Sequence, residues 1–144
     1  MTATHPPHSD NNLPPHIHTY RRFAPHCDVT VVGATPDELS RLPTTTNPTA
    51  LRTHALNLTA LGDDDLTKLI ADNAHIVLSL LPAPLHPRVA RACLRAGAHL
   101  VTSSYVSEEL RALDAEARGR GLVFLNEAGL GPGCVSVCVG WCVV

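Results

Sequence analysis

Short apolar runs alternate with amphipathic segments through most of the chain. The β-branched run "DVTVV" (28–32) predicts a strand, and "HIVLSLLP" (75–82) is a near-continuous apolar run, typical of a strand buried on both faces. Two more strands are predicted at "AHLVTSS" (98–104) and "LVFLNE" (122–127), and a weak one at "THALNL" (53–58). The segment "TTTNPT" (44–49) has the composition of a loop.

Four helices are predicted between these runs. A short one follows Pro36, because "DELSRL" begins with acidic residues, and another covers "DDDLTKLIAD" (63–72), which carries apolar residues at helical spacing behind an acidic start. The segment "PRVARACLRAG" (87–97) places Val89, Ala92, Cys93 and Ala96 on one face and ends at Gly97, a good C-cap. Ser107 is placed to cap the fourth helix, "EELRALDAEARGRG".

Alternation of strand and helix is the pattern of right-handed βαβ units. It predicts the α/β class, with a Rossmann-like parallel sheet and flanking helices. In such sheets a ligand binds at the carboxyl ends of the strands. The polar or glycine-containing segments at those ends are Gly33–Thr35, Asn57, Ser79, Ser103–Tyr105 and Asn126–Gly131.

Residues 1–26 differ in composition from the rest and hold five prolines and five of the nine histidines. Such a segment buries too little apolar surface to offset its ordering entropy, so we expect a disordered tail at 1–26 and a folded domain over 27–144. The histidines could in principle bind a metal, but no acidic or cysteine partner converges on them, so no metal site is expected.

Charge and cysteine usage exclude several classes of function. A net charge of −2 with one lysine argues against a nucleic-acid surface, and no apolar run reaches the roughly 20 residues of a membrane helix. Five cysteines without paired spacing suggest a reducing compartment, and we expect the cytoplasm. Cys134, Cys138 and Cys142 recur every fourth residue within an apolar segment and are interpreted as buried hydrophobes rather than metal ligands.

The glycine motif G-x-G-x-x-G of dinucleotide-binding folds is absent, because the first glycine of the chain is Gly33. Gly33 could be a degenerate first turn, or it could end the second strand of a fold whose first βα unit is missing. In the second case Gly33–Thr35 would face the adenosine ribose. Neither an acid nor an arginine occupies that strand end, so the choice between NAD and NADP stays open.

The late stretch "NEAGLGPG" (126–133) could be a phosphate loop, a structural turn or an active-site loop. Pro132 removes one backbone donor that a phosphate loop would use, which weighs against the first alternative. Ser103, Ser104 and Tyr105 are equally open to two interpretations, as a helix-entry turn or as hydroxyl groups that orient a polar ligand.

Two segments, "SLLPAPLHPRVARACLRAGAHLVTSSYVSEEL" and "LDAEARGRGLVFLNEAGLGPG", resemble the nucleotide-binding domain of saccharopine dehydrogenases. The family pattern S-L-[IL]-P, H-x-x-V, A-C, T-[AST]-S-Y-[VI]-S and [NG]-E-x-G-L-D-P-G is followed closely over residues 76–133 and weakly over 29–58. The resemblance implies an NAD- or NADP-dependent oxidoreductase of lysine metabolism. Such an enzyme interconverts saccharopine with glutamate and 2-aminoadipate 6-semialdehyde.

The resemblance also implies site residues, although it identifies no catalytic side chain. The implied substrate contacts are Ser104 and Tyr105, and Gly131, where the family keeps an acid, would touch cofactor or substrate. Asn57 stands where the family has an aspartate near the adenine. The implied cofactor contacts are Gly33, Ala34, Thr35, Asn57, Leu58, Leu81, Thr102, Ser103 and Gly131.

Departures from the family pattern lead us to expect a truncated chain. The glycine-rich first βα unit and the larger substrate domain are missing, and "CVSVCVGWCVV" replaces the usual continuation after Gly133. The sheet is therefore expected to be incomplete and the chain alone to be an inactive fragment. The alternatives are a non-catalytic remnant acting as an interaction subunit, and another NAD(P)-dependent Rossmann enzyme. The parent could be monofunctional or part of a bifunctional aminoadipate semialdehyde synthase, and a homodimer is compatible with it.

Overall fold

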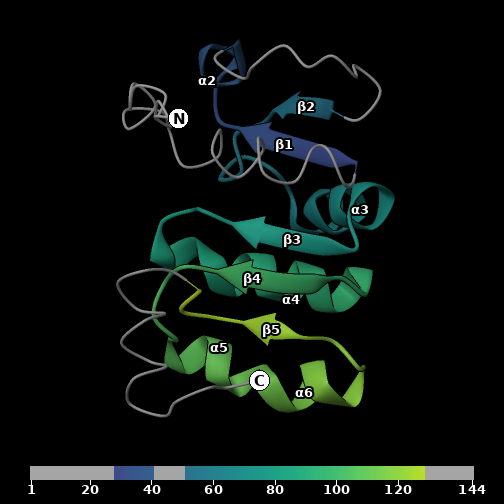
Figure 1. Ribbon diagram of the computed structural model, residues 1–144, viewed down its shortest axis with the longest axis vertical. Coiled ribbons are helices and arrows are strands. Elements are labelled where there is room, and N and C mark those ends of the chain that lie inside the picture. Colours follow the sequence, from purple (N-terminus) through teal and green to yellow (C-terminus); the bar gives the residue numbers. More distant parts are fainter. Residues whose placement is uncertain (1–27, 41–50, 129–144) are drawn as a thin grey trace, which may run out of the picture. The chain divides into compact units, whose positions relative to one another are not determined.

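A computed structural model of the chain describes residues 28–40 and 51–128 (Figure 1). The chain divides into two compact units, Met1–Leu56 and Asn57–Val144. The predicted boundary between the tail and the folded domain, at residues 26 and 27, lies outside the described residues, as do the predicted loop 44–49 and the stretch from Gly129 onward.

The first unit contains two parallel strands and one short helix. Strand β1 (Val29–Gly33) pairs with β2 (Leu51–Ala55) from Val29 opposite Leu51 to Gly33 opposite Ala55. Helix α2 (Pro36–Ser40) follows β1. This helix starts at Pro36 with acids in its first turn, as predicted, and Thr35 caps it by accepting a hydrogen bond from the Glu38 backbone N–H at 3.3 Å.

Strand β2 begins and ends earlier than the predicted strand at 53–58. Its end is set by a turn at Asn57, whose side-chain oxygen accepts hydrogen bonds from the Thr59 backbone N–H at 3.1 Å and from the Thr59 hydroxyl at 2.7 Å. Asparagine in this arrangement competes with the strand ladder for the backbone, which explains why the chain leaves the sheet there.

The second unit contains a three-stranded parallel sheet in the order β3-β4-β5. Parallel pairing throughout the described strands confirms the predicted α/β class with flanking helices. The elements of this unit are α3 (Asp63–Asn73), β3 (Ile76–Ser79), a 3-10 turn (Ala83–Leu85), α4 (His86–Ala96), β4 (His99–Thr102), α5 (Glu108–Ala112), α6 (Asp114–Gly119) and β5 (Phe124–Leu125).

Helix α4 supplies much of the core of this unit. Val89, Ala92 and Cys93 are buried as their spacing predicts, and Ala96 is partly buried against the same cluster. Leu100 of β4 is fully buried beside them, and α3 and α5 contribute Leu66, Ile70 and Leu110. Gly97 ends α4 with a φ of 75°, in the left-handed region that glycine adopts without strain, which confirms the predicted C-cap.

Two predictions about this sheet are wrong in detail. Strand β3 is not buried on both faces, because Ile76 and Leu78 are 63% and 39% exposed, whereas Val77 and Ser79 face α4. In the described part of the second unit, β3 pairs with β4 alone and lies at the edge of the sheet. An edge strand with one covered face has the same apolar composition as a central strand, so composition alone does not separate the two. The segment 108–121 also forms two short helices, although Ser107 caps the first as predicted.

Candidate functional site

The carboxyl ends of β3 and β4 form a polar edge in the second unit. Ser79 and Thr102 are register partners at the last position of each strand. The segment after β5 returns to this edge, because the Glu127 N–H donates to the Ser104 carbonyl at 3.1 Å and the Ala128 N–H to the Thr102 carbonyl at 3.0 Å. Residues that the sequence placed at three separate strand ends therefore lie side by side.

A buried histidine connects the hydroxyl groups of this edge. His86, the first residue of α4, is 1% exposed. Its Nδ1 lies 2.9 Å from Ser79 Oγ, and its Nε2 lies 2.9 Å from Ser104 Oγ and 3.4 Å from Thr102 Oγ1. The Ser104 backbone N–H also donates to Thr102 Oγ1 at 2.9 Å. Burial lowers the pKa of His86 from its ordinary value of 6.5, so the ring is neutral at neutral pH.

The turn after β5 carries two further unusual features. Within residues 28–40 and 51–128, Asn126 Oδ1 is buried without a hydrogen-bond partner. Glu127 has a φ of 59°, which a residue with a side chain rarely adopts, and its carboxylate accepts a hydrogen bond from the Val106 N–H at 3.3 Å. An unpaired buried acceptor and a strained residue are both costly, and such costs concentrate at ligand-binding sites.

The predicted ligand contacts at this edge differ in accessibility. Ser103 and Tyr105 are exposed, the latter to 68%, and Ser104 and Leu81 are half-buried. Thr102 is fully buried, and its hydroxyl holds the Ser104 backbone rather than facing solvent. Gly131 and the cysteines at 134, 138 and 142 lie outside the described residues.

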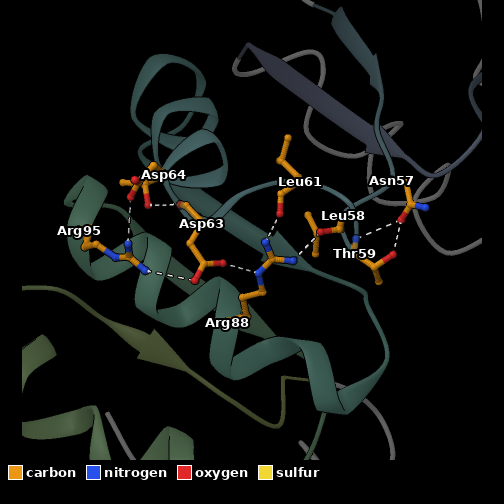
Figure 2. A network of polar contacts seen from close by, with 9 residues as sticks. Asn57, Leu58, Thr59, Leu61, Asp63, Asp64, Arg88 and Arg95 are labelled. Atoms are coloured by element: carbon orange, nitrogen blue, oxygen red, sulfur yellow. Dashed lines mark hydrogen bonds and ion pairs between the residues drawn. The ribbon is translucent and has the colours of Figure 1, made fainter.

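The predicted adenine contacts, Asn57 and Leu58, lie in a loop that Arg88 holds against α4 (Figure 2). The Arg88 guanidinium donates to the Leu58 carbonyl at 2.5 Å, to the Leu61 carbonyl, and to the Asp63 carboxylate at 2.6 Å. Figure 2 shows the amide nitrogen of Asn57 directed away from this network, while its oxygen is engaged by Thr59. The group that Asn57 leaves for a ligand is therefore its amide donor.

Asp63 lies between two arginines of α4. Asp63 forms an ion pair with Arg88 (Figure 2). The Arg95 guanidinium lies 4.0 Å from the Asp63 carboxylate and 3.5 Å from the Asp64 carboxylate. The hydrogen bond from Arg88 lowers the pKa of Asp63 below its ordinary value of 3.8, and the charges of the neighbouring arginines act in the same direction. These contacts anchor the start of α3, and with it the loop before it.

The remaining predicted residues, Gly33–Thr35, lie in the first unit at the end of β1. The Ala34 N–H donates to the Glu38 carboxylate at 2.9 Å, so an acidic side chain of α2 lies at this strand end. A Cβ on Gly33 would lie 3.0 Å from Leu39 Cδ2 and 3.3 Å from the Glu38 carboxylate. A side chain here would therefore be tight against Leu39 and Glu38, and these flexible side chains would have to shift to admit it.

Three residues of this site were missed in the sequence. His86 stands in the H-x-x-V motif that carries part of the resemblance, and its spacing of seven from Ser79 gives no signal of contact by itself. Arg88 resembles the other arginines of its helix until the loop carbonyls are placed beside it. Glu38 is four residues from Ala34, and only the turn at Thr35 brings them together.

Two further searches concern the described residues alone. Among residues 28–40 and 51–128, no three His, Cys, Asp or Glu side chains are placed to hold a metal ion. None of the helices in those ranges has the length and apolar character needed to cross a membrane.

Comparisons with known proteins agree on one family. The family model described as the saccharopine dehydrogenase NADP binding domain matches residues 15–125. Saccharopine dehydrogenase (NADP+, L-glutamate-forming) of Saccharomyces cerevisiae is 42% identical over 79 residues, which are 55% of this chain and 18% of that protein. Alpha-aminoadipic semialdehyde synthase of Arabidopsis thaliana is 40% identical over 79 residues, which are 55% of this chain and 7% of that protein.

A mitochondrial alpha-aminoadipic semialdehyde synthase of Rattus norvegicus is 32% identical over 80 residues, which are 56% of this chain and 9% of that protein. Among solved structures, the apo histidine-tagged saccharopine dehydrogenase (L-Glu forming) from Saccharomyces cerevisiae superposes with a TM-score of 0.71 at 32% identity, covering 85% of this chain and 27% of that one. The chain therefore spans less than a fifth of the length of these curated relatives.

Proposed function

Because this chain belongs to the family of the saccharopine dehydrogenase NADP binding domain, we propose that it forms part of the nucleotide and substrate site of a saccharopine dehydrogenase. The observation that carries the proposal is the polar edge at the ends of β3 and β4, where Ser79, Thr102 and Ser104 surround His86 and the turn after β5 returns beside them. Ligands of parallel α/β sheets bind at this edge.

The chemistry of this edge fits a dinucleotide. Among the described residues the buried Asn126 Oδ1 lacks a donor, which an amide or ribose hydroxyl of a cofactor can supply, and Ser103, next to Ser104 in the chain, offers an exposed hydroxyl. When bound, the nicotinamide group would accept hydride from, or donate it to, the carbon that bears the secondary amine of saccharopine. The role of the chain is to hold both molecules by hydroxyl and backbone contacts.

The assignment of individual contacts follows the family pattern. Ser103, Leu81, Asn57 and Leu58 are proposed to contact the cofactor, and Ser104 and Tyr105 the substrate. Gly33, Ala34 and Thr35 are proposed to face the adenosine ribose and Gly131 both ligands, while the buried Thr102 is proposed to act through the Ser104 backbone.

We propose NADP as the nucleotide, because the matching family model describes an NADP binding domain. The resemblance to the same family implies the conversion of saccharopine to glutamate and 2-aminoadipate 6-semialdehyde. Measurements of ligand binding and turnover distinguish a chain that catalyses this conversion from a non-catalytic remnant. The expected cytoplasmic location also remains a prediction, since the rat relative is named as mitochondrial.

Titration of the purified chain with NADPH and with NADH, followed by nicotinamide fluorescence, tests this function. We expect saturable binding that the Ser103→Ala variant weakens about two- to tenfold, the equivalent of one hydrogen bond. Thr67→Ala is the matched control, because that hydroxyl bonds the Asp63 carbonyl on α3, away from the strand ends. An unsaturable titration, or equal losses in both variants, would contradict the proposed nucleotide site.

A further inference from the structure

His86 occupies a position that lets it control the hydroxyl group of Ser104. The ring lies between two serine hydroxyls, with Ser79 Oγ 2.9 Å from Nδ1 and Ser104 Oγ 2.9 Å from Nε2. Ser79 and His86 are buried, at 3% and 1% exposure, whereas Ser104 is half-buried. These three polar groups therefore form a hydrogen-bonded row. Its Ser79 end is shielded from solvent, and its Ser104 end lies at the polar edge of the sheet.

A neutral imidazole has one N–H, and its position decides what Ser104 offers to a ligand. With the proton on Nδ1, the ring donates to Ser79, and the Ser104 hydroxyl must donate to Nε2, so only its lone pairs remain for a ligand. With the proton on Nε2, the ring donates to Ser104 and the Ser104 hydrogen is released for a ligand. The two tautomers thus make Ser104 an acceptor or a donor.

The burial of Ser79 distinguishes these arrangements. Among the described residues, its hydroxyl bonds to His86 Nδ1 and to no other side chain or backbone group. If Nδ1 carried the proton, the Ser79 hydrogen would be buried without an acceptor, which costs more than an unused lone pair. If Nδ1 is unprotonated, the Ser79 hydroxyl donates to it and the hydrogen is satisfied.

Thr102 bears on the same choice, because its hydroxyl is fully buried and, among the described residues, Nε2 is the acceptor within reach of its hydrogen. Its Oγ1 lies 3.4 Å from Nε2, longer than the Ser104 contact, and it already accepts the Ser104 backbone N–H. A protonated Nε2 gives up this long contact, whereas a protonated Nδ1 gives up the Ser79 contact at 2.9 Å, and the shorter hydrogen bond is the stronger one. The comparison of the two contacts therefore still favours the proton on Nε2.

We propose that His86 is a positioning residue that is protonated on Nε2, donates to Ser104 Oγ and thereby turns the Ser104 hydroxyl into a donor toward the ligand. The ligand group it would take is an acceptor oxygen, such as a carboxylate of an amino-acid substrate. The proposal deepens the function proposed above, on which the identity of the ligand rests, while the proton position is a property of the chain alone.

The position of the proton is measured first, on the ligand-free chain. Long-range ¹H–¹⁵N correlation spectra of the ¹⁵N-labelled protein at pH 7.5 separate protonated from unprotonated ring nitrogens, and the spectrum of His86→Gln identifies the His86 signals. We expect a protonated Nε2 and an unprotonated Nδ1. A protonated Nδ1, or a ring protonated at both nitrogens, overturns the proposal whether or not the chain binds any ligand.

The consequence for binding is measured with saccharopine as the probe, by calorimetry in the presence of NADP+. We expect Ser104→Ala and His86→Leu each to lower the affinity about tenfold, and the double variant to lose no more than Ser104→Ala, because both remove one donor. His86→Gln, whose amide N–H takes the place of Nε2–H, should stay within about threefold of the natural chain. Folding of every variant is checked by amide exchange.

A folded His86→Leu variant with unchanged affinity, or additive losses in the double variant, overturns the proposal. If the natural chain does not bind saccharopine at all, the proposed function fails, and the tautomer measured above still decides the proposal about His86.

Discussion

Glu38 shows how a single side chain changes the chemistry of a strand end. Its carboxylate accepts the Ala34 N–H at 2.9 Å, in the segment proposed above to face the adenosine ribose, where an NADP enzyme would accommodate a 2′-phosphate. The acid occupies a backbone donor and adds a negative charge. Both effects oppose a 2′-phosphate, so Glu38 would limit the affinity for the NADP proposed above.

We therefore expect Glu38→Gln, which keeps the acceptor for Ala34, to raise the affinity for NADPH about fivefold and not to raise that for NADH. Two charges about 4 Å apart in water repel by about 1 kcal/mol, which corresponds to this factor. Fluorescence titration with both nucleotides measures it.

Asp28→Asn is the matched control, since it removes the same charge at the opposite end of β1. A gain for both nucleotides in Glu38→Gln, or an equal gain in the control, would contradict a local effect of Glu38.

Helix α4 is the element on which the site of the second unit depends. It buries one face against the sheet, begins with His86 and uses Arg88 to hold the loop that contains Asn57. Its end is fixed by Gly97 in the left-handed conformation. The length and position of this one helix therefore set both the polar edge and the neighbouring loop.

Gly97→Ala should destabilise the second unit by about 1 kcal/mol, because alanine is strained at a φ of 75°. Gly119→Ala is the control: a Cβ at either glycine meets nothing within 4 Å, but only Gly97 has a positive φ. The control should be neutral or slightly stabilising. The quantity measured is the free energy of opening of the Leu100 amide from hydrogen exchange, and equal losses in the two variants would argue against the C-cap.

Arg88→Lys should destabilise the Asn57–Gly62 loop by about 1–3 kcal/mol, because an ammonium group cannot replace a guanidinium that contacts two carbonyls and a carboxylate at once. Arg91→Lys on the same helix is the control, since Arg91 makes an exposed ion pair with Glu109 at 2.9 Å, and exposed pairs contribute less than about 1 kcal/mol. The amides of Ala60 and Leu61 should exchange faster only in Arg88→Lys, and unchanged exchange would contradict the anchoring role.

At the scale of the whole molecule, the predicted contacts are divided between the two units. Gly33, Ala34 and Thr35 belong to the first, and the contacts from Asn57 onward belong to the second. Each unit presents carboxyl ends of parallel strands, Gly33 beside Ala55 in one and Ser79 beside Thr102 in the other.

The stability of the second unit should depend on pH through His86. Its pKa is lowered by burial in the folded state, so the unfolded chain binds the proton more readily and stability falls as the pH drops below 6.5 through the lowered value. Urea unfolding at pH 7.5, 6.5 and 5.5, followed by amides of β4, measures the decrease. His86→Gln should remove much of that decrease, and an unchanged pH dependence in this variant would assign it to other groups.

Much of the fold was predictable, because helix caps, turns and buried helix faces depend on residues that are close together in the sequence. The cap at Ser107, the glycine at 97 and the buried face of α4 follow from short-range rules. The polar ends of β3 and β4 were also predictable, since a parallel sheet brings carboxyl ends to one edge. The position of β3 at the edge of the described three-stranded sheet was not predictable, because edge and central strands have the same apolar composition.

By itself the sequence determined the α/β class, the order of strands and helices, and the motifs that carry membership of the family. Only the tertiary structure decided that His86 lies between Ser79 and Ser104 and that Arg88 holds the loop at Asn57. It also decided that Asn126 buries an acceptor that no described residue satisfies. The reason is physical: hydrophobic periodicity depends on residues a few positions apart, whereas a hydrogen bond between distant residues depends on how whole elements pack.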